Sequence, residues 1–313
     1  LNLFKIHKRE YAGEKRHVSV MKESFINGKN GGNKKILIQD ENGKFILQDA
    51  KKWGFSEGNF SIAIGSGDFN QDGWPDIYIA NDWGADELYI NKNGSHFEKV
   101  SGGLFGSLGK DTYKGMNVTV ADFDKNGFMD IYVSNIHKPL LMEGSMLWMF
   151  DENSSKSPAI VRDAASDYGV INDDRWGWGA AATDLNNDSW LELVQVNGMF
   201  GDECDHIYDR CPDYWYLEEK FSRGPNIGKF TLRNANHWAN VRGKCLMPNE
   251  KTRVFLNLGA GGQKKFIDIA DEVGMTDRIN ARGVAAVDLD NDGRQDLVIA
   301  RSYAEPLIYK NTP

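Results

Sequence analysis

The sequence predicts an all-β protein built from repeated units of four short antiparallel strands. Short apolar runs with period-two alternation, such as Ile77–Ala80 and Leu297–Ala300, are typical of strands. The chain has 33 glycines and 8 prolines, and its frequent Asn-Gly and Asp-Gly pairs favour tight turns over long helices. With 41% apolar and 12% aromatic residues, the 313-residue chain has enough apolar material for a sizeable core.

One acidic segment occurs four times. The copies read "DFNQDGWPDIYIAND" from Asp68, "DFDKNGFMDIYVSN" from Asp122, "DLNNDSWLELVQVNG" from Asp184 and "DLDNDGRQDLVIA" from Asp288. Each copy follows an apolar run rich in small residues and precedes an alternating run. The order is therefore strand, acidic loop, strand, repeated along the chain.

A second element lies between the copies and reads as two strands joined by an Asn/Gly turn, as in "ELYINKNGSHFEKV". The second copy is followed by the much longer "MLWMFDENSSKSPAIVRDAASDYG", which we interpret in the same way. Four-stranded units at this spacing are the signature of β-propeller blades. We expect about five blades in this chain, with three full blades and two incomplete ones, as part of a ring of six to eight. Residues 1–34 would be an upstream blade end or irregular, residues 35–313 the propeller, and residues 199–251 an insertion.

The acidic loops have the spacing D-x-[DN]-x-[DN]-G-x-x-[DE], which places oxygens at loop positions 1, 3, 5 and 9. Ca²⁺ takes six to eight hard oxygen ligands at flexible distances, and a backbone carbonyl at position 7 would add one more. Mg²⁺ fits less well because it demands tight octahedral geometry. The loops therefore predict up to four Ca²⁺ ions, whose binding would be coupled to blade stability.

The predicted ligands follow from this spacing. By loop they are Asp68, Asn70, Asp72, the Trp74 carbonyl and Asp76 (loop 1, residues 68–76); Asp122, Asp124, Asn126, the Phe128 carbonyl and Asp130 (loop 2, residues 122–130); Asp184, Asn186, Asp188, the Trp190 carbonyl and Glu192 (loop 3, residues 184–192); and Asp288, Asp290, Asp292, the Arg294 carbonyl and Asp296 (loop 4, residues 288–296). Loop 3 departs from the pattern because Ser189 replaces glycine and Glu192 replaces aspartate, so we expect it to bind most weakly or with different coordination.

These residues resemble the FG-GAP/VCBS repeats of integrin α-like propellers. They are most similar to the bacterial and cartilage-acidic-protein-like proteins in which such repeats precede an ASPIC module. The resemblance covers about residues 35–311 apart from the insertion. It implies a Ca²⁺-stabilised propeller, usually exported, that acts in adhesion, assembly or ligand binding, with further blades upstream.

Charge and cysteine content restrict the function. The net charge of −8 argues against a nucleic-acid partner, which would need clustered Lys and Arg. No apolar run is long enough for a membrane span. All three cysteines, Cys204, Cys211 and Cys245, lie in the insertion, which suits a local disulfide in an oxidising compartment. We therefore expect a periplasmic, extracellular or other non-cytosolic location.

The sequence contains no recognisable catalytic constellation. Its six histidines are scattered, with no HExxH motif, and no G-x-S-x-G elbow is present. We expect a non-catalytic interaction or scaffold subunit of an exported complex, and the alternative is a glycan-binding or adhesion propeller. The aromatic residues of the insertion either pack it onto its own blade or dock a partner chain.

Overall fold

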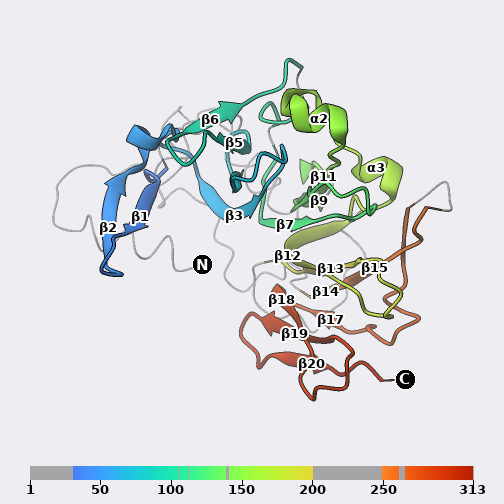
Figure 1. The fold of residues 1–313 in the computed structure, drawn as a ribbon. Coiled ribbons are helices and arrows are strands. Elements are labelled where there is room, and N and C mark those ends of the chain that lie inside the picture. The colour runs from blue at the N-terminus through green and yellow to red at the C-terminus, as the bar shows by residue number, and fades with distance from the viewer. Residues whose placement is uncertain are drawn as a thin grey trace, which may run out of the picture.

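The computed structural model describes residues 31–104, 106–111, 113–138, 141–199, 249–260 and 265–312, and its elements are almost all β-strands (Figure 1). Residues 200–248 of the predicted insertion, which include its three cysteines, and residues 1–30 lie outside the described residues. The strands are β1 (Lys35–Gln39), β2 (Phe45–Asp49), β3 (Ser61–Gly67), β4 (Asp76–Asn81), β5 (Glu87–Asn91), β6 (Phe97–Val100), β7 (Asn117–Ala121), β8 (Asp130–Ser134), β9 (Ile136–Lys138), β10 (Leu141–Met142), β11 (Met146–Trp148), β12 (Arg175–Thr183), β13 (Glu192–Asn197), β14 (Glu250–Lys251), β15 (Arg253–Asn257), β16 (Phe266–Asp268), β17 (Arg278–Ile279), β18 (Ala281–Val287), β19 (Asp296–Arg301) and β20 (Leu307–Tyr309).

The strands form antiparallel sheets in the order of the repeats. We call them blade 1 (β3-β4-β5-β6), blade 2 (β7-β8-β11), blade 3 (β12-β13-β15-β16) and blade 4 (β18-β19-β20), preceded by the β1–β2 hairpin. Strand β12 extends beyond blade 3 to pair with β9, which pairs with β10, while β14 pairs with β17. The first strands of neighbouring blades contact one another, β3 with β7, β7 with β12 and β12 with β18. The blades therefore follow one another along an arc (Figure 1), and the fold is all-β and propeller-like, as predicted.

Each acidic loop joins the first two strands of a blade in the same register. The residue before the loop pairs with the carboxylate at loop position 9, as Gly67 does with Asp76 and Ala121 with Asp130. Thr183 pairs with Glu192 in the same way. Because side chains alternate between the faces of a strand, this shared register turns every position-9 carboxylate the same way. It occupies the first position of its second strand, where it is buried.

The cores lie between neighbouring sheets. Between blades 1 and 2, Tyr78, Leu88 and Trp148 are fully buried and pack together. Equivalent clusters join blade 2 to blade 3 and blade 3 to blade 4. Burying one large apolar side chain stabilises a fold by roughly 1.5–3 kcal/mol, so each blade depends on its neighbours for much of its stability.

Blade 2 lacks the fourth strand that the sequence predicts. After β11 the chain forms the helices α2 (Glu152–Lys156), η2 (Pro158–Ile160) and α3 (Ala165–Tyr168), and only a single bridge pairs Trp148 with Asp163. The Asp151 side chain caps α2 by accepting hydrogen bonds from the backbone of Asn153 and Ser154. The interpretation of this segment as a hairpin, and hence of blade 2 as a full blade, was wrong because the Asp-x-x-Ser capping box nucleates a helical turn instead.

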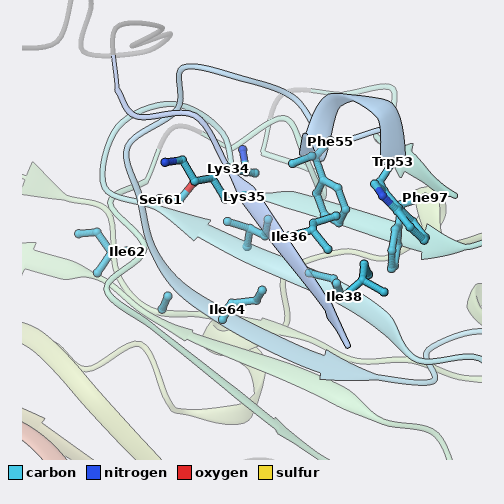
Figure 2. Close-up of a pocket in the computed structure, with 14 residues that line it drawn as sticks. Lys34, Lys35, Ile36, Ile38, Trp53, Phe55, Ser61, Ile62, Ile64 and Phe97 are labelled. Atoms are coloured by element: carbon cyan, nitrogen blue, oxygen red, sulfur yellow. The ribbon is translucent and has the colours of Figure 1, made fainter. Parts of the chain in front are cut away.

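The β1–β2 hairpin packs less completely against blade 1 than the blades pack against each other. A short 3₁₀ turn, η1 (Ala50–Trp53), follows the hairpin. Figure 2 shows the pocket between the hairpin and blade 1, which has a volume of about 450 Å³ and is lined mainly by apolar side chains. On its blade 1 side, Ile62 and Ile64 of β3 remain 46% and 65% exposed. The equivalent faces of β7, β12 and β18 are each covered by the preceding blade.

Candidate metal centres

The four acidic loops share one backbone conformation. The residues at position 4, Gln71, Lys125, Asn187 and Asn291, all have a positive φ between 55° and 60°. Position 6 is also left-handed, with φ values of 85° to 88° at the three glycines and 70° at Ser189. Left-handed backbone is unfavourable for most side chains, which explains the glycine at position 6. Ser189 nevertheless adopts the same turn, so loop 3 keeps the common shape.

The carboxylate at position 1 holds each loop closed. It accepts hydrogen bonds from the backbone N–H groups of positions 5 and 6, as Asp68 does from Asp72 at 3.0 Å and from Gly73 at 2.8 Å. Asp122, Asp184 and Asp288 accept the equivalent pairs at 2.8 to 3.1 Å. The backbone thus wraps around this side chain and leaves it half-buried in the loop.

The carboxylate at position 9 ties the loop to the second and third strands. Asp130, fully buried, accepts the N–H of Phe123 in its own loop at 3.0 Å and that of Phe150, just after β11, at 2.8 Å. Asp76 and Asp296 make the same two bonds. In loop 3, Oε2 of Glu192 accepts the Leu185 N–H at 2.7 Å, while its buried Oε1 has no hydrogen-bond partner among the described residues.

Burial makes ionisation of Asp76, Asp130 and Glu192 unfavourable. It raises the pKa of Asp76 to about 6, that of Asp130 to about 8 and that of Glu192 to about 7. The neighbouring loop carboxylates at positions 1, 3 or 5 raise each pKa further, and backbone hydrogen bonds offset only part of the effect. Each of these loops therefore holds more negative charge than its own surroundings stabilise.

The predicted ligands converge to different degrees. Oxygens of Asp122, Asp124 and Asp130 in loop 2 lie within 4.8 Å of one another, and so do those of Asp288, Asp290 and Asp292 in loop 4. Among the described residues, loops 1 and 3 form no such group of three acids. Position 3 is asparagine there, and the amide nitrogens of Asn70 and Asn186 donate to the position-5 carboxylates at 2.9 and 3.0 Å.

In loop 4 the charge is partly neutralised by the protein itself. The Lys310 ammonium pairs with Asp290, and Nη2 of Arg294 lies 2.5 Å from Oδ2 of Asp292. The Lys310 hydrogen bond lowers the pKa of Asp290. The Arg294 side chain thus contacts the same carboxylate to which its own N–H donates at 2.9 Å.

The position-7 residues Trp74, Phe128, Trp190 and Arg294 lie on the rim of each loop, where their N–H groups donate to position 5. That their carbonyls act as ligands stays a prediction.

Sequence reasoning missed a further group of side chains, Asn91, Asn257 and Asn311. Each stands two residues after the aromatic residue of the third strand, in blades 1, 3 and 4. Their amides donate to position-8 carbonyls of the acidic loop in their own blade. The signal was present in the sequence as an aromatic residue followed two positions later by asparagine, in "LYIN", "VFLN" and "IYKN".

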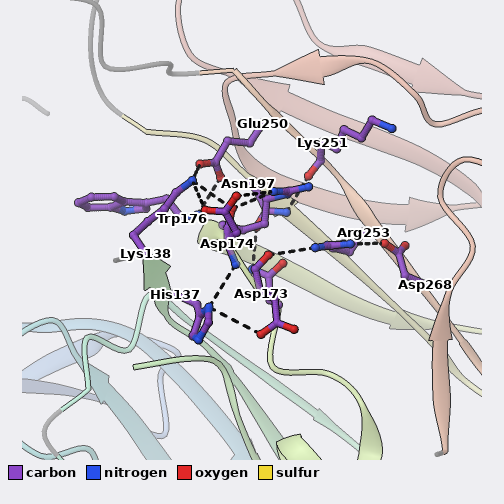
Figure 3. Close-up of polar contacts among 12 residues, drawn as sticks. His137, Lys138, Asp173, Asp174, Trp176, Asn197, Glu250, Lys251, Arg253 and Asp268 are labelled. Carbon is purple, nitrogen blue, oxygen red and sulfur yellow. Dashed lines mark hydrogen bonds and ion pairs between the residues drawn. The ribbon is translucent and has the colours of Figure 1, made fainter. Parts of the chain in front are cut away.

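A polar network lies at the opposite ends of these strands (Figure 3). Glu250 accepts the Trp176 N–H at 2.7 Å and pairs with Lys138 at 2.8 Å, which connects β9, β12 and β14. Arg253 pairs with Asp268 at 2.6 Å. The network joins strands β9 and β14 to blade 3, and its ion pairs stabilise this face of the protein.

The helices of the described region all fall short of the length and apolarity that a membrane crossing needs. None of the curated proteins matches the chain. Residues 68–133, which run from the start of loop 1 almost to the end of β8 and include loops 1 and 2, match the FG-GAP-like repeat family.

Proposed function

We propose that the protein is a non-catalytic, Ca²⁺-stabilised propeller that serves as an interaction or assembly subunit of an exported or periplasmic complex. One observation carries the metal part of this proposal. Four loops of equal conformation each bury a carboxylate at position 9, beside further acidic side chains. Asn-Gly turns as such do not need a buried acid, whereas a cation site does.

The donor set fits Ca²⁺. Every predicted ligand is a carboxylate, amide or carbonyl oxygen, which is the donor type that Ca²⁺ and Mg²⁺ prefer. In loop 2, Asp122, Asp124 and Asp130 would hold the ion, and the buried, unpartnered Oε1 of Glu192 would accept it in loop 3. The ion would supply positive charge that offsets repulsion among the carboxylates. The chain's own contribution is to orient them, by the N–H groups that Asp122 and Asp130 accept.

The interaction part rests on the repeat. FG-GAP repeats commonly mediate protein interaction or adhesion, and blades 1 and 2 contain the matching segment. The aromatic-rich insertion is our candidate for the docking element. Export is consistent with calcium sites of moderate affinity, because millimolar Ca²⁺ is available outside the cell.

Two measurements test the proposal separately. Thermal unfolding of the metal-free chain, with and without millimolar Ca²⁺, is expected to show a higher midpoint with Ca²⁺, and equal midpoints would disprove the metal role. Co-purification from the native source, comparing the full chain with a variant that lacks residues 203–246, tests the docking role. Loss of partners in the variant supports it, and an unchanged set of partners rejects the insertion as the docking element.

A further inference from the structure

Neighbouring acidic loops are joined to one another by their position-4 side chains. Nε2 of Gln71 in loop 1 donates to the Gly127 carbonyl of loop 2 at 2.8 Å. Nδ2 of Asn187 in loop 3 donates to the Gly293 carbonyl of loop 4 at 3.2 Å. Between loops 2 and 3 the ammonium of Lys125 lies 4.5 Å from the centre of the Trp190 ring. The position-4 residue has a left-handed φ in all four loops.

A second set of contacts runs in the opposite direction, from each blade back to the preceding loop. Nδ2 of Asn257 donates to the carbonyl of Phe123 at loop 2 position 2 at 2.9 Å, and Asn311 donates to that of Leu185 in loop 3 at 2.7 Å. In blade 2 the equivalent residue is Phe150, which stacks on Phe69 at loop 1 position 2 with ring centres 5.3 Å apart. All three junctions between described loops therefore carry both contacts.

At the junction of loops 3 and 4, both contacts end on backbone carbonyls that the ligand set controls, those of Gly293 at position 6 and Leu185 at position 2. Position 2 directly follows the position-1 carboxylate, and its N–H is bound by the position-9 carboxylate, as Leu289 is by Asp296 at 3.1 Å. Position 6 donates its N–H to the position-1 carboxylate, as Gly293 does to Asp288 at 2.9 Å. A metal ion that fixes these carboxylates also fixes the carbonyls that the neighbouring loop uses.

We propose that the four metal sites are energetically coupled along the arc, and that the position-4 residues with the blade asparagines carry the coupling. This inference rests on the proposed Ca²⁺ role. A metal ion bound in one loop fixes the carbonyl that accepts a hydrogen bond from the neighbouring loop. The neighbouring loop therefore loses less conformational entropy when it binds its own ion. Coupling of this kind is reciprocal, and contacts of one or two hydrogen bonds correspond to the lower end of the usual range, about 5-fold in affinity.

The junction of loops 3 and 4 offers a clean test, because the Trp190 ring at loop 3 position 7 sensitises emission from Tb³⁺ bound in that loop. We would use the full chain with Trp74→Phe, which removes the tryptophan of loop 1, and with Asp122→Asn and Asp124→Asn, which disable loop 2, because the Trp190 ring also lies beside Lys125 of that loop. The Tb³⁺ affinity of loop 3 is measured with loop 4 intact and with loop 4 disabled by Asp288→Asn and Asp292→Asn. The ratio of the two affinities is the coupling.

The same ratio is then measured after the links are cut by Asn187→Gly and Asn311→Ala. The matched control is Asn291→Gly, which removes a position-4 asparagine with the same left-handed φ, 60° against 57°, but with no contact to another loop among the described residues. Glycine tolerates this φ, so neither change strains the loop. Gln39→Ala adds a second control, since it removes an amide-to-glycine bond of 3.0 Å in the distant β1–β2 hairpin.

We expect a ratio of about 5 in the parent chain and in both controls, and a ratio near 1 when both links are cut. A ratio near 1 in the parent, with Tb³⁺ still bound, would overturn the coupling and leave the metal role standing. A ratio that survives cutting both links would also overturn it, because the coupling would then run elsewhere. Absence of Tb³⁺ and Ca²⁺ binding would reject the metal role itself.

Discussion

Replacing Asp130 by asparagine is expected to have opposite effects with and without Ca²⁺. The side chain is fully buried and accepts two backbone N–H groups, from Phe123 and Phe150. Asparagine has the same shape but only one acceptor oxygen, so one of these N–H groups loses its partner. Leaving a buried donor unsatisfied costs about 1–3 kcal/mol.

In the metal-free protein, the substitution also removes the free-energy cost of ionising the buried Asp130 carboxyl. The folded pKa of Asp130 is about 8 against 3.8 in the unfolded chain, so the folded state binds the extra proton between these values and stability falls as the pH rises through them. At pH 7 this amounts to an upper estimate of about 4 kcal/mol at ~1.4 kcal/mol per pKa unit. Asparagine removes this cost, which offsets the lost hydrogen bond.

With Ca²⁺ bound, the cation stabilises the carboxylate and this gain disappears. We therefore expect Asp130→Asn to be destabilised by about 2–4 kcal/mol in Ca²⁺ and to be equal to the parent, or more stable by about 1–3 kcal/mol, in EDTA. Thermal unfolding at pH 7 measures both, and a change of about 2–4 kcal/mol corresponds to roughly 3–6 °C for a chain of this length.

The control is Asp163→Asn, because Asp163 lies outside the acidic loops and accepts two backbone N–H groups at 2.9 Å, both on Oδ1, so that the amide oxygen of asparagine can keep both bonds. Its effect is expected to be the same in Ca²⁺ and in EDTA. The reasoning would be refuted if Asp130→Asn showed the same change in stability under both conditions.

Three further changes test other parts of the structure. Burial raises the pKa of Asp111 to about 7, and it also raises the pKa of the neighbouring Asp86, so the stability of the parent in saturating Ca²⁺ is expected to fall from pH 5 to pH 8. Urea titrations are expected to show a smaller fall for Asp111→Asn, and an equal dependence on pH in the variant contradicts this. Ser189→Gly is expected to stabilise the protein by about 0.5–1 kcal/mol because glycine tolerates the φ of 70°, whereas the control Ser66→Gly in strand β3 is expected to destabilise it. A lower stability of Ser189→Gly in the same urea titration would argue against strain at this position. Trp148→Ala is expected to cost about 3–5 kcal/mol by emptying the core between blades 1 and 2, and a cost below 1 kcal/mol by chemical denaturation would mean that this core is not formed.

The acidic loops and their strands were predictable because their geometry is local. Nine residues determine both the turn and the register, so the pairing of Ala121 with Asp130 follows from the same pattern that predicts the ligands. The assignment of Ca²⁺ to these loops stays a prediction. The period-two runs do not determine which faces are buried, because β8 and β13 are buried at every position.

Other features depend on contacts that spacing does not encode. The bond from Gln71 to Gly127 joins residues far apart in the sequence, and it exists only because the blades are set side by side. The helical segment after β11 begins with the Asp151 cap, whose local hydrogen bonds outweighed the strand pattern of its neighbours. The extension of β12 to β9 likewise depends on how two blades meet.

The pairing of Lys310 with Asp290 has a consequence for how loop 4 responds to ionic strength. An ion entering this loop must displace a tethered ammonium, whereas the described carboxylates of loops 1 to 3 form no lysine ion pair, and Lys265 acts on Asp124 of loop 2 without pairing with it. Monovalent salt screens the attraction of the loop for Ca²⁺, but it equally weakens the lysine that competes with it. The two effects oppose each other, so the affinity of loop 4 is expected to vary least with salt, and this loop would lose the smallest fraction of its affinity as the ionic strength rises.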